Sequence, residues 1–277
     1  MVLGFYEVGK DAKDVIFGGR TGLYVFDQRV SLSTKTADGV ALALQAINKG
    51  DKADLSLKST YNHNNYGLTA LFKTSTDKID VTATVDKLAP GLKAAVHATL
   101  PDAQSGKLLL DYVPCSYAHV RATLGLNTQP KVALATTAQR GNVIYGAEGT
   151  FDTGKSEVTG YGLLAGWLGP DSQLVLQLTD KLETAKVLAS HNYTRDKAVA
   201  AEVSRPVKGG DVSFTLGIQQ RLDNGALVKA KVNHAGLASL LYEQRLASGE
   251  RIALSAQVDT INIGGKAPKV GVAFDLA

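Results

Sequence analysis

Lysine and arginine side chains recur at alternate positions in many segments of this 277-residue sequence. Side chains two positions apart in an extended strand point to the same side, so Lys229 and Lys231 share one face. Such a face attracts anions, because ammonium and guanidinium groups bind phosphate oxygens. The candidate residues in these segments are Arg29, Lys35, Lys58, Lys73, Lys93, Arg121, Lys229 and Lys231. Lys13 and Arg20, near the N-terminus, are further candidates for phosphate contacts, and the alternative for each residue is a solvated position without an individual role.

Residue patterns typical of catalysis or metal binding do not stand out. The five histidines are scattered without the spacing of a metal site. No Ser/His/Asp or Cys/His arrangement is evident, and Gly160-Tyr161-Gly162 lacks the lysine and the strand-to-helix context of a phosphate loop. The single Cys115 cannot form an internal disulfide. We therefore predict no enzyme activity, no metal and no cofactor.

The chain from Leu23 to Leu276 consists of about nineteen alternating segments of about ten residues, separated by Gly, Asn, Asp or Pro. A clear example places Val212, Phe214, Leu216 and Ile218 against small or polar neighbours. No linker or change in composition interrupts this pattern. We predict a single domain over residues 1–277, with a helical segment at 1–20 and a β-barrel at 23–277.

The apolar side of these segments is almost free of charge, whereas the other side carries Lys, Arg, Asp, Ser and Thr. A strand of about ten residues crosses a bilayer, and a charge on its lipid face would cost about 2–4 kcal/mol. Open sheet edges are not tolerated in lipid, so the sheet must close, and this many strands leave an aqueous pore. The sequence predicts an all-β transmembrane barrel that is antiparallel except for one closing pair, Val25–Ser33 with Val270–Leu276.

The segment Leu3–Arg20 has helical periodicity, with Val8, Val15 and Ile16 on one face and charged residues on the other. Gly18-Gly19 is expected to end the helix or act as a hinge. An amphipathic helix of this kind fits inside a wide pore, with its apolar face on the wall. No apolar signal-peptide region is visible, and the acidic residues argue against a cleaved mitochondrial presequence. We therefore expect the helix to be retained in the lumen.

Several short motifs resemble the voltage-dependent anion channels, or eukaryotic porins, of the mitochondrial outer membrane, in particular the plant and algal members. They occur in the family's order over nearly the whole chain. The motifs are Tyr6-x-x-Gly9-Lys10-x-Ala12-Lys13-Asp14, Ala89-Pro90-Gly91-Leu92-Lys93, Val228-Lys229-Ala230-Lys231-Val232-Asn233 and Lys269-Val270-Gly271-Val272. The resemblance implies an integral protein of that membrane.

The resemblance also implies a function. It suggests a voltage-gated, weakly anion-selective pore for ATP, ADP, phosphate, small metabolites and ions, with no nucleic acid required. Membrane lipid and other barrels would be its partners. The helix and its exit would take part in gating through Val8, Val15, Ile16, Gly18 and Gly19. One departure concerns a lipid-facing glutamate of animal members, whose position here is Phe72, so the docking and calcium effects of that carboxylate are not expected.

Three alternatives remain open. A non-conducting docking or structural barrel would share the fold. A relative of the protein-translocase pore would be expected to have a longer front segment and a more acidic lumen. A soluble carbohydrate-binding β-protein would need aromatic sites, yet aromatics make up only 6% of the chain, with one Trp. The pore interpretation predicts that reversing the charges of Lys229 and Lys231 shifts selectivity toward cations.

Overall fold

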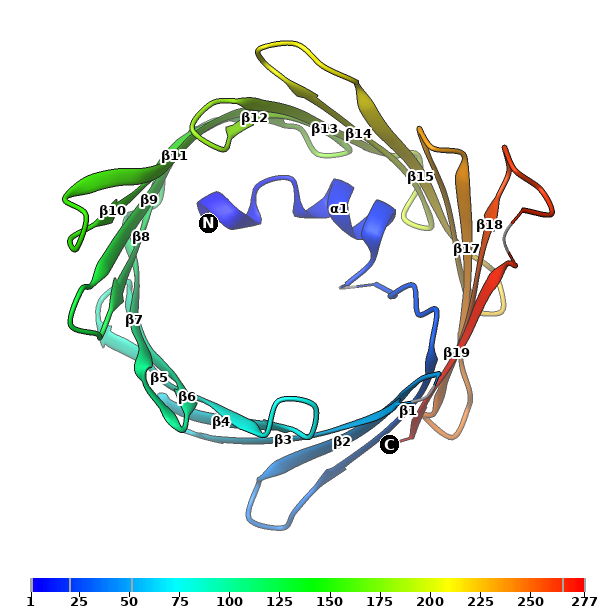
Figure 1. The fold of residues 1–277 in the computed structure, drawn as a ribbon, viewed down its shortest axis with the longest axis horizontal. Coiled ribbons are helices and arrows are strands. Elements are labelled where there is room, and N and C mark those ends of the chain that lie inside the picture. Colours follow the sequence, from blue (N-terminus) through cyan, green and yellow to red (C-terminus); the bar gives the residue numbers. More distant parts are fainter. Residues whose placement is uncertain (1, 20, 51, 266, 277) are drawn as a thin grey trace. The chain divides into compact units, whose positions relative to one another are not determined.

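The computed structural model describes residues 2–19, 21–50, 52–265 and 267–276. Its described elements are one 3₁₀ turn, one α-helix and nineteen strands (Figure 1). The bounds are η1 Phe5–Glu7, α1 Lys10–Phe17, β1 Gln28–Lys35, β2 Ala41–Lys49, β3 Lys52–His63, β4 Tyr66–Lys73, β5 Lys78–Ala89, β6 Leu92–Leu100, β7 Asp102–Cys115, β8 Ala118–Gly125, β9 Lys131–Arg140, β10 Val143–Asp152, β11 Glu157–Leu168, β12 Ser172–Thr179, β13 Thr184–Asn192, β14 Lys197–Pro206, β15 Ser213–Arg221, β16 Leu227–Asn233, β17 Leu237–Arg245, β18 Arg251–Asp259 and β19 Lys269–Leu276.

The strands form one sheet in which each strand pairs with the next along the chain. β1 also pairs with β19, which closes the sheet into a nineteen-stranded barrel. Because nineteen is odd, a meander of antiparallel neighbours brings its first and last strands together in parallel, so the barrel is mixed. The predicted fold class is therefore confirmed. No helix among the described residues is long and apolar enough to span a membrane.

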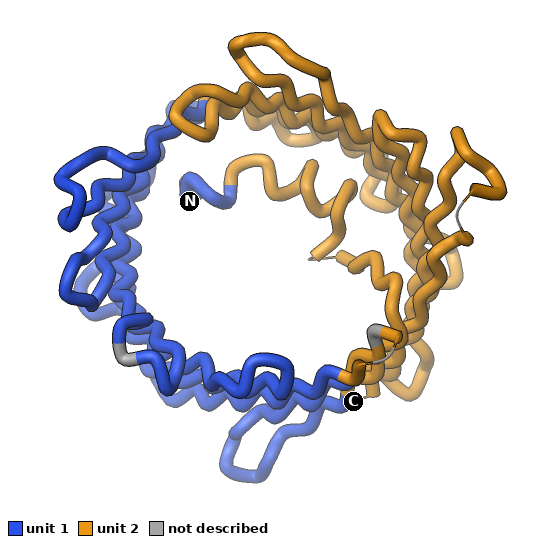
Figure 2. The backbone as a smooth tube through the Cα atoms, viewed as in Figure 1, with its two compact units in different colours: residues 1–7, 32–46, 54–164 blue, residues 8–31, 47–53, 165–277 orange. Residues whose placement is uncertain are grey.

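The chain divides into two compact units (Figure 2). One contains residues 1–7, 32–46 and 54–164, and the other contains residues 8–31, 47–53 and 165–277. The first unit includes η1 and most of β2 to β11, and the second includes α1 and β12 to β19. The 3₁₀ turn and the helix therefore belong to different units.

Side chains along each strand alternate between an apolar outward face and a more polar inward face. In β12, Leu174 and Leu176 are 53% and 45% exposed, whereas Val175 between them is fully buried. Dozens of large apolar side chains are exposed in this way, far more than a soluble monomer tolerates. The exposed apolar side of the strands is the surface expected to meet lipid acyl chains.

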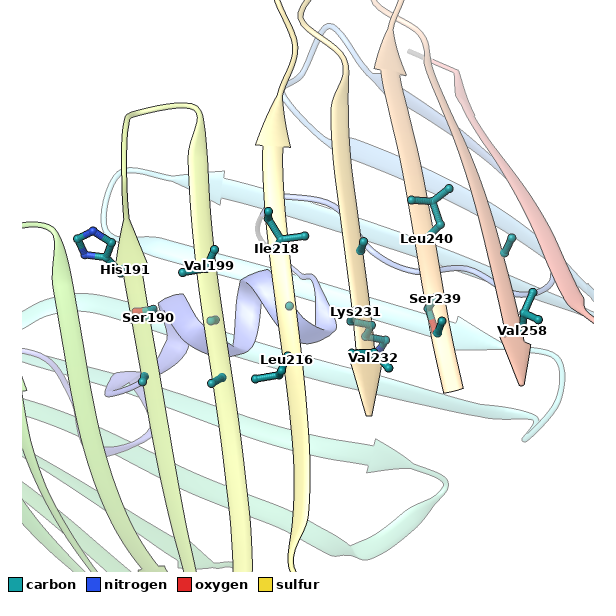
Figure 3. A pocket seen from close by; sticks show the side chains of 17 residues that line it. Ser190, His191, Val199, Leu216, Ile218, Lys231, Val232, Ser239, Leu240 and Val258 are labelled. Atoms are coloured by element: carbon teal, nitrogen blue, oxygen red, sulfur yellow. The ribbon is translucent and has the colours of Figure 1, made fainter. Parts of the chain in front are cut away.

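The outward face of β13–β18 also carries an apolar hollow of about 850 Å³ (Figure 3). Leu216, Ile218 and Leu240 line it, and each occupies an outward position of its strand. Small alanine side chains between them leave the surface concave. This hollow offers an anion almost no polar contact, whereas the basic side chains of the strands lie on the inward face.

The N-terminal helix is shorter than predicted. The sequence pattern predicts one helix over Leu3–Arg20, but the α-helix covers only the eight residues Lys10–Phe17. Gly9 precedes it with φ of 78°, a left-handed conformation that interrupts the helix after η1. Arg20 lies outside the described residues. The single predicted helix is thus a 3₁₀ turn and a two-turn α-helix separated by Val8 and Gly9.

The first strand also begins later than predicted, at Gln28. The preceding Tyr24 and Val25 leave the sheet and pack with Leu241, Ala253 and Ala273 in a buried apolar cluster. The Val25 N–H donates to Ser255 Oγ at 3.1 Å. This side-chain partner satisfies a backbone donor that a strand neighbour would otherwise bind. The segment between the helix and β1 is therefore fixed to the inward face of β17–β19.

Candidate functional site

Helix α1 lies on the inward faces of β13, β14, β15 and β16. Its apolar residues Val15 and Ile16 are 5% and 0% exposed, and Val8, which precedes the helix, is 1% exposed. Ile16 packs against Gly217 of β15, where an added Cβ would lie 3.2 Å from its Cα. Removing these side chains from water stabilises the docked helix by roughly 1.5–3 kcal/mol for each fully buried residue. Figure 1 shows the helix beside these strands.

A buried ion pair connects the helix to β16. The Lys229 ammonium is fully buried and donates to the Asp14 carbonyl at 2.7 Å. It also lies 3.4 Å from the Gly22 carbonyl and 3.8 Å from Asp14 Oδ2. Charges this buried persist only when they are paired and hydrogen-bonded. Lys229 therefore joins the last turn of the helix, the following segment and the wall at one point.

The Asp14 carboxylate also holds the chain that leaves the helix. Its Oδ1 accepts from the Thr21 N–H at 3.1 Å, and the Thr21 hydroxyl donates to its Oδ2. The Thr21 hydroxyl oxygen lies 2.9 Å from Gln219 Oε1 on β15. We call Asp14, Thr21, Gln219 and Lys229 the Asp14 cluster. The cluster fixes both ends of the turn that follows α1.

That turn contains the predicted hinge at Gly18-Gly19. Gly18 has φ of 78° and forms an isolated β-bridge with Leu23, and Gly19 N–H donates to the Gly22 carbonyl at 2.9 Å. A Cβ on Gly18 would lie only 2.0 Å from the Gly22 carbonyl oxygen. In this state the Gly18-Gly19 segment is a closed, hydrogen-bonded turn. Glycine is required at Gly18 for both its φ and the close approach of the backbone.

In the other unit, η1 packs on β9 and β10. The Thr137 hydroxyl donates to the Leu3 carbonyl at 2.6 Å. The Arg121 guanidinium lies 5.7 Å from the centre of the Tyr6 ring, within cation–π range. Arg121 also donates to both Asp111 carboxylate oxygens, at 2.5 and 3.1 Å. The first residues of the chain are thus held against charged side chains of the wall.

Burial and the neighbouring Glu148 carboxylate raise the pKa of Tyr6 to about 12. The folded state therefore retains the phenolic proton at pH values where an unfolded tyrosine, with a pKa near 10, loses it. The contribution of the protonated Tyr6 side chain to the free energy of unfolding is complete below pH 10. It is lost as the pH rises through the folded-state pKa of about 12.

We expect Tyr6→Phe to remove a phenolate absorbance transition near pH 12, seen as the difference between the two titration curves. Tyr66→Phe serves as the control, because Tyr66 is exposed on the outward face of β4. If Tyr6→Phe instead removes a transition near pH 10, Tyr6 is not held beside Glu148, and this contact is wrong.

The candidate basic residues fall into distinct environments. Lys35, Lys58, Lys73 and Lys93 are exposed on inward positions. Lys73 and Lys93 pair with Asp80 and Asp86 at 3.9 and 3.2 Å, whereas Lys35 and Lys58 have no ion pair among the described residues. Lys13, Arg121 and Lys231 are half-buried, and Arg29 is buried 3.7 Å from Asp275. The exposed lysines are those available to a passing anion.

Two sequence-based expectations need correction. Lys229 is expected to face the aqueous lumen, but the helix covers it completely. Asp14 is expected on the solvated side of the helix, but it is only 7% exposed. Lys231, two positions from Lys229, instead lies 4.5 Å from the centre of the Tyr24 ring. Reversing both lysines would therefore disturb the docking of the helix, so these residues do not give a clean test of selectivity.

Sequence reasoning did not identify Thr21 or Gln219 as partners of Asp14, because nothing in the strand pattern links positions 198 residues apart. The adjacent glycines indicated a tight exit, but not the residues that fix it. Within the described part of the chain, no group of three or more His, Cys, Asp or Glu residues could hold a metal ion.

Comparison with known proteins matches residues 4–271 to the eukaryotic porin family. The chain belongs to this family. It is 32% identical to the mitochondrial outer membrane protein porin 1 of Oryza sativa subsp. japonica, over 99% of this chain and 98% of the relative. Porin 1 of Arabidopsis thaliana and the porin of 36 kDa of Solanum tuberosum are each 32% identical, with the same coverage. Its similarity to these plant porins confirms the resemblance inferred from the motifs.

The sequence motifs align Phe72 with the lipid-facing glutamate of animal members. The structure of this eukaryotic porin likewise places Phe72 on the outward face of β4. Phe72 is 37% exposed and shares its face with Leu68 and Tyr66. An apolar ring is compatible with a lipid-facing position, where a carboxylate would be costly. The family membership and the names of the relatives indicate a channel rather than an enzyme.

Proposed function

We propose that the chain is a passive diffusion pore of the mitochondrial outer membrane. It passes ATP, ADP, phosphate, small metabolites and ions, prefers anions weakly, and closes partly at high voltage. The observation that carries this proposal is the closed nineteen-stranded sheet, with lysines exposed on inward positions and apolar side chains outward. Barrels with many more than eight strands leave an aqueous channel. The names of the plant relatives support the same membrane and activity.

We propose that residues 1–277 form one functional porin domain that contacts membrane lipid and can associate with other barrels. Selectivity arises from the summed field of the inward side chains, without a stereospecific site. We propose that α1 narrows the pore and takes part in gating through its apolar residues Val15 and Ile16, together with Val8 just before the helix. The Gly18-Gly19 turn is the segment through which the helix would move. Lys13 and Arg20 are proposed to meet anions entering along the helix.

Solute release from liposomes tests the proposal. Protein refolded into vesicles loaded with ATP and a large dextran should release ATP within minutes and retain the dextran. Empty vesicles should retain both solutes. Retention of ATP by vesicles that contain inserted protein would favour a non-conducting docking barrel, which the names of the relatives do not favour.

The lysines without an ion pair supply a sharper test of selectivity. The double variant Lys35→Glu/Lys58→Glu changes the charge of the pore wall by four units. In a KCl gradient across a planar bilayer, we expect the reversal potential to move from the anion side to the cation side. The matched control is Lys155→Glu/Lys181→Glu, which makes the same change in turns outside the strands. An equal shift in both variants would show that these positions have no special access to the permeating ions.

A further inference from the structure

A small polar cavity of about 210 Å³ lies in the second compact unit, at the ends of β15 and β17 and the beginnings of β16 and β18. Three arginines line it, Arg221, Arg245 and Arg251, together with Glu243 and Thr21. All four charged side chains occupy inward positions of their strands. The cavity is several times larger than the roughly 30 Å³ occupied by one water molecule in the liquid, so it can hold a small polyatomic ion.

The charges in this cavity are not balanced. Glu243 is 3.1 Å from Arg251, and Arg251 also pairs with Asp275 on β19. Arg221 and Arg245 have no ion pair with any residue that the structure describes. The carboxylates of Glu243 and Asp275 balance two of the three guanidinium groups that line the cavity, which leaves an excess of one positive charge. Arg29, beside Asp275, adds a second. The free guanidinium groups are thus left without a protein anion.

The strand register makes the excess charge unusual. Arg245 of β17 lies directly opposite Arg251 of β18. Like charges in this relation destabilise an antiparallel pair, unless an opposite charge lies between them. Glu243 is directed to Arg251 and leaves Arg245 without such a partner. An anion in the cavity would supply the missing charge to Arg245 and Arg221.

We propose that this cavity is a binding site for a compact phosphate-type oxyanion. Guanidinium forks match the oxygens of phosphate and form strong, charge-assisted hydrogen bonds with them. The inward positions of the arginines indicate a soluble anion rather than a lipid headgroup. Because Thr21 belongs to the Asp14 cluster and also lines the cavity, the bound anion contacts the segment that follows the helix. The site goes beyond the proposed pore, since conduction requires no saturable binding.

The test is isothermal titration of inorganic phosphate into the full chain, refolded in a phosphate-free detergent at low and constant ionic strength. We expect one saturable site. Arg245→Gln should weaken binding about tenfold, because a hydrogen bond to a charged group contributes roughly that factor to affinity. Arg195→Gln is the matched control. It removes the same charge from the turn between β13 and β14, at the same end of the strands but outside the cavity, and should change affinity less than twofold.

Several outcomes would overturn the site. These are an absence of saturable phosphate binding, an equal loss in Arg195→Gln and Arg245→Gln, or displacement by phosphatidic acid without any binding of inorganic phosphate. If Arg245→Gln does not refold, as judged by circular dichroism, Arg221→Gln carries the same expectation. Saturable binding by protein that does not conduct would retain the site and reject the pore. Conduction without saturable binding would retain the pore and reject the site.

Discussion

Replacing Lys229 with methionine is expected to release the helix from the wall. Methionine keeps the length of the side chain but removes the ammonium group beside the buried Asp14 carboxylate. The Asp14 carbonyl loses its donor at 2.7 Å and keeps the Gly18 N–H at 2.9 Å. Breaking a buried pair in this way costs about 3–5 kcal/mol. A loss of about 3 kcal/mol raises the population of undocked helix by roughly 100-fold. The rate of tryptic cleavage after Lys13, which lies within α1, should rise by a similar factor.

Lys231→Met is the matched control for this variant. It removes the same charge from the same face of β16, but Lys231 has no carboxylate partner among the described residues. Losing its contact with the Tyr24 ring costs only about 0.5–2 kcal/mol. The double variant Asp14→Asn/Lys229→Met should lose less docking free energy than the sum of the losses in the two single variants, because it removes both charges of the pair. Equal cleavage rates in the two lysine variants would refute the role of the Asp14 cluster.

Gly18→Ala is expected to open the turn that follows the helix. The new Cβ would lie 2.0 Å from the Gly22 carbonyl oxygen, and alanine would have to adopt φ of 78°. The left-handed conformation and the steric conflict together cost at least about 2 kcal/mol. Amide hydrogen exchange in residues 14–23 should therefore accelerate by roughly 30-fold.

The control for the turn is Gly149→Ala. Gly149 lies in β10, and a Cβ there would meet no atom within 4 Å. Its exchange pattern should match that of the native protein. If Gly18→Ala also leaves exchange in residues 14–23 unchanged, the turn has other conformations of similar free energy and acts as a hinge without strain.

The strands were predictable because a membrane imposes one rule on all of them. A charge facing lipid is costly, so Leu174, Leu176 and similar residues alternate with tolerated polar positions along the chain. The number of strands followed from counting the alternating segments. The closing pair followed from the requirement that no edge remain open. The apolar stripe of Val8, Val15 and Ile16 likewise predicted the buried face of the helix.

Alternation alone could not distinguish Lys229 from Lys231, because both occupy inward positions of β16. Their difference depends on where the helix ends and how the chain turns at Gly18, because Lys229 donates to the Asp14 and Gly22 carbonyls on either side of that turn. Asp14 was misplaced for the same reason, since its partner Thr21 becomes adjacent only after the chain turns at Gly18. The arginine cavity was missed because it gathers the ends of several strands, which no local pattern relates.

Single-channel recording of the refolded protein in a planar bilayer tests the central claim most directly. With a KCl gradient and a voltage ramp, the account predicts large current steps, a reversal potential on the anion side and partial closure at both polarities. No conductance from protein shown to be inserted would contradict the pore and shift the interpretation to a docking or structural barrel.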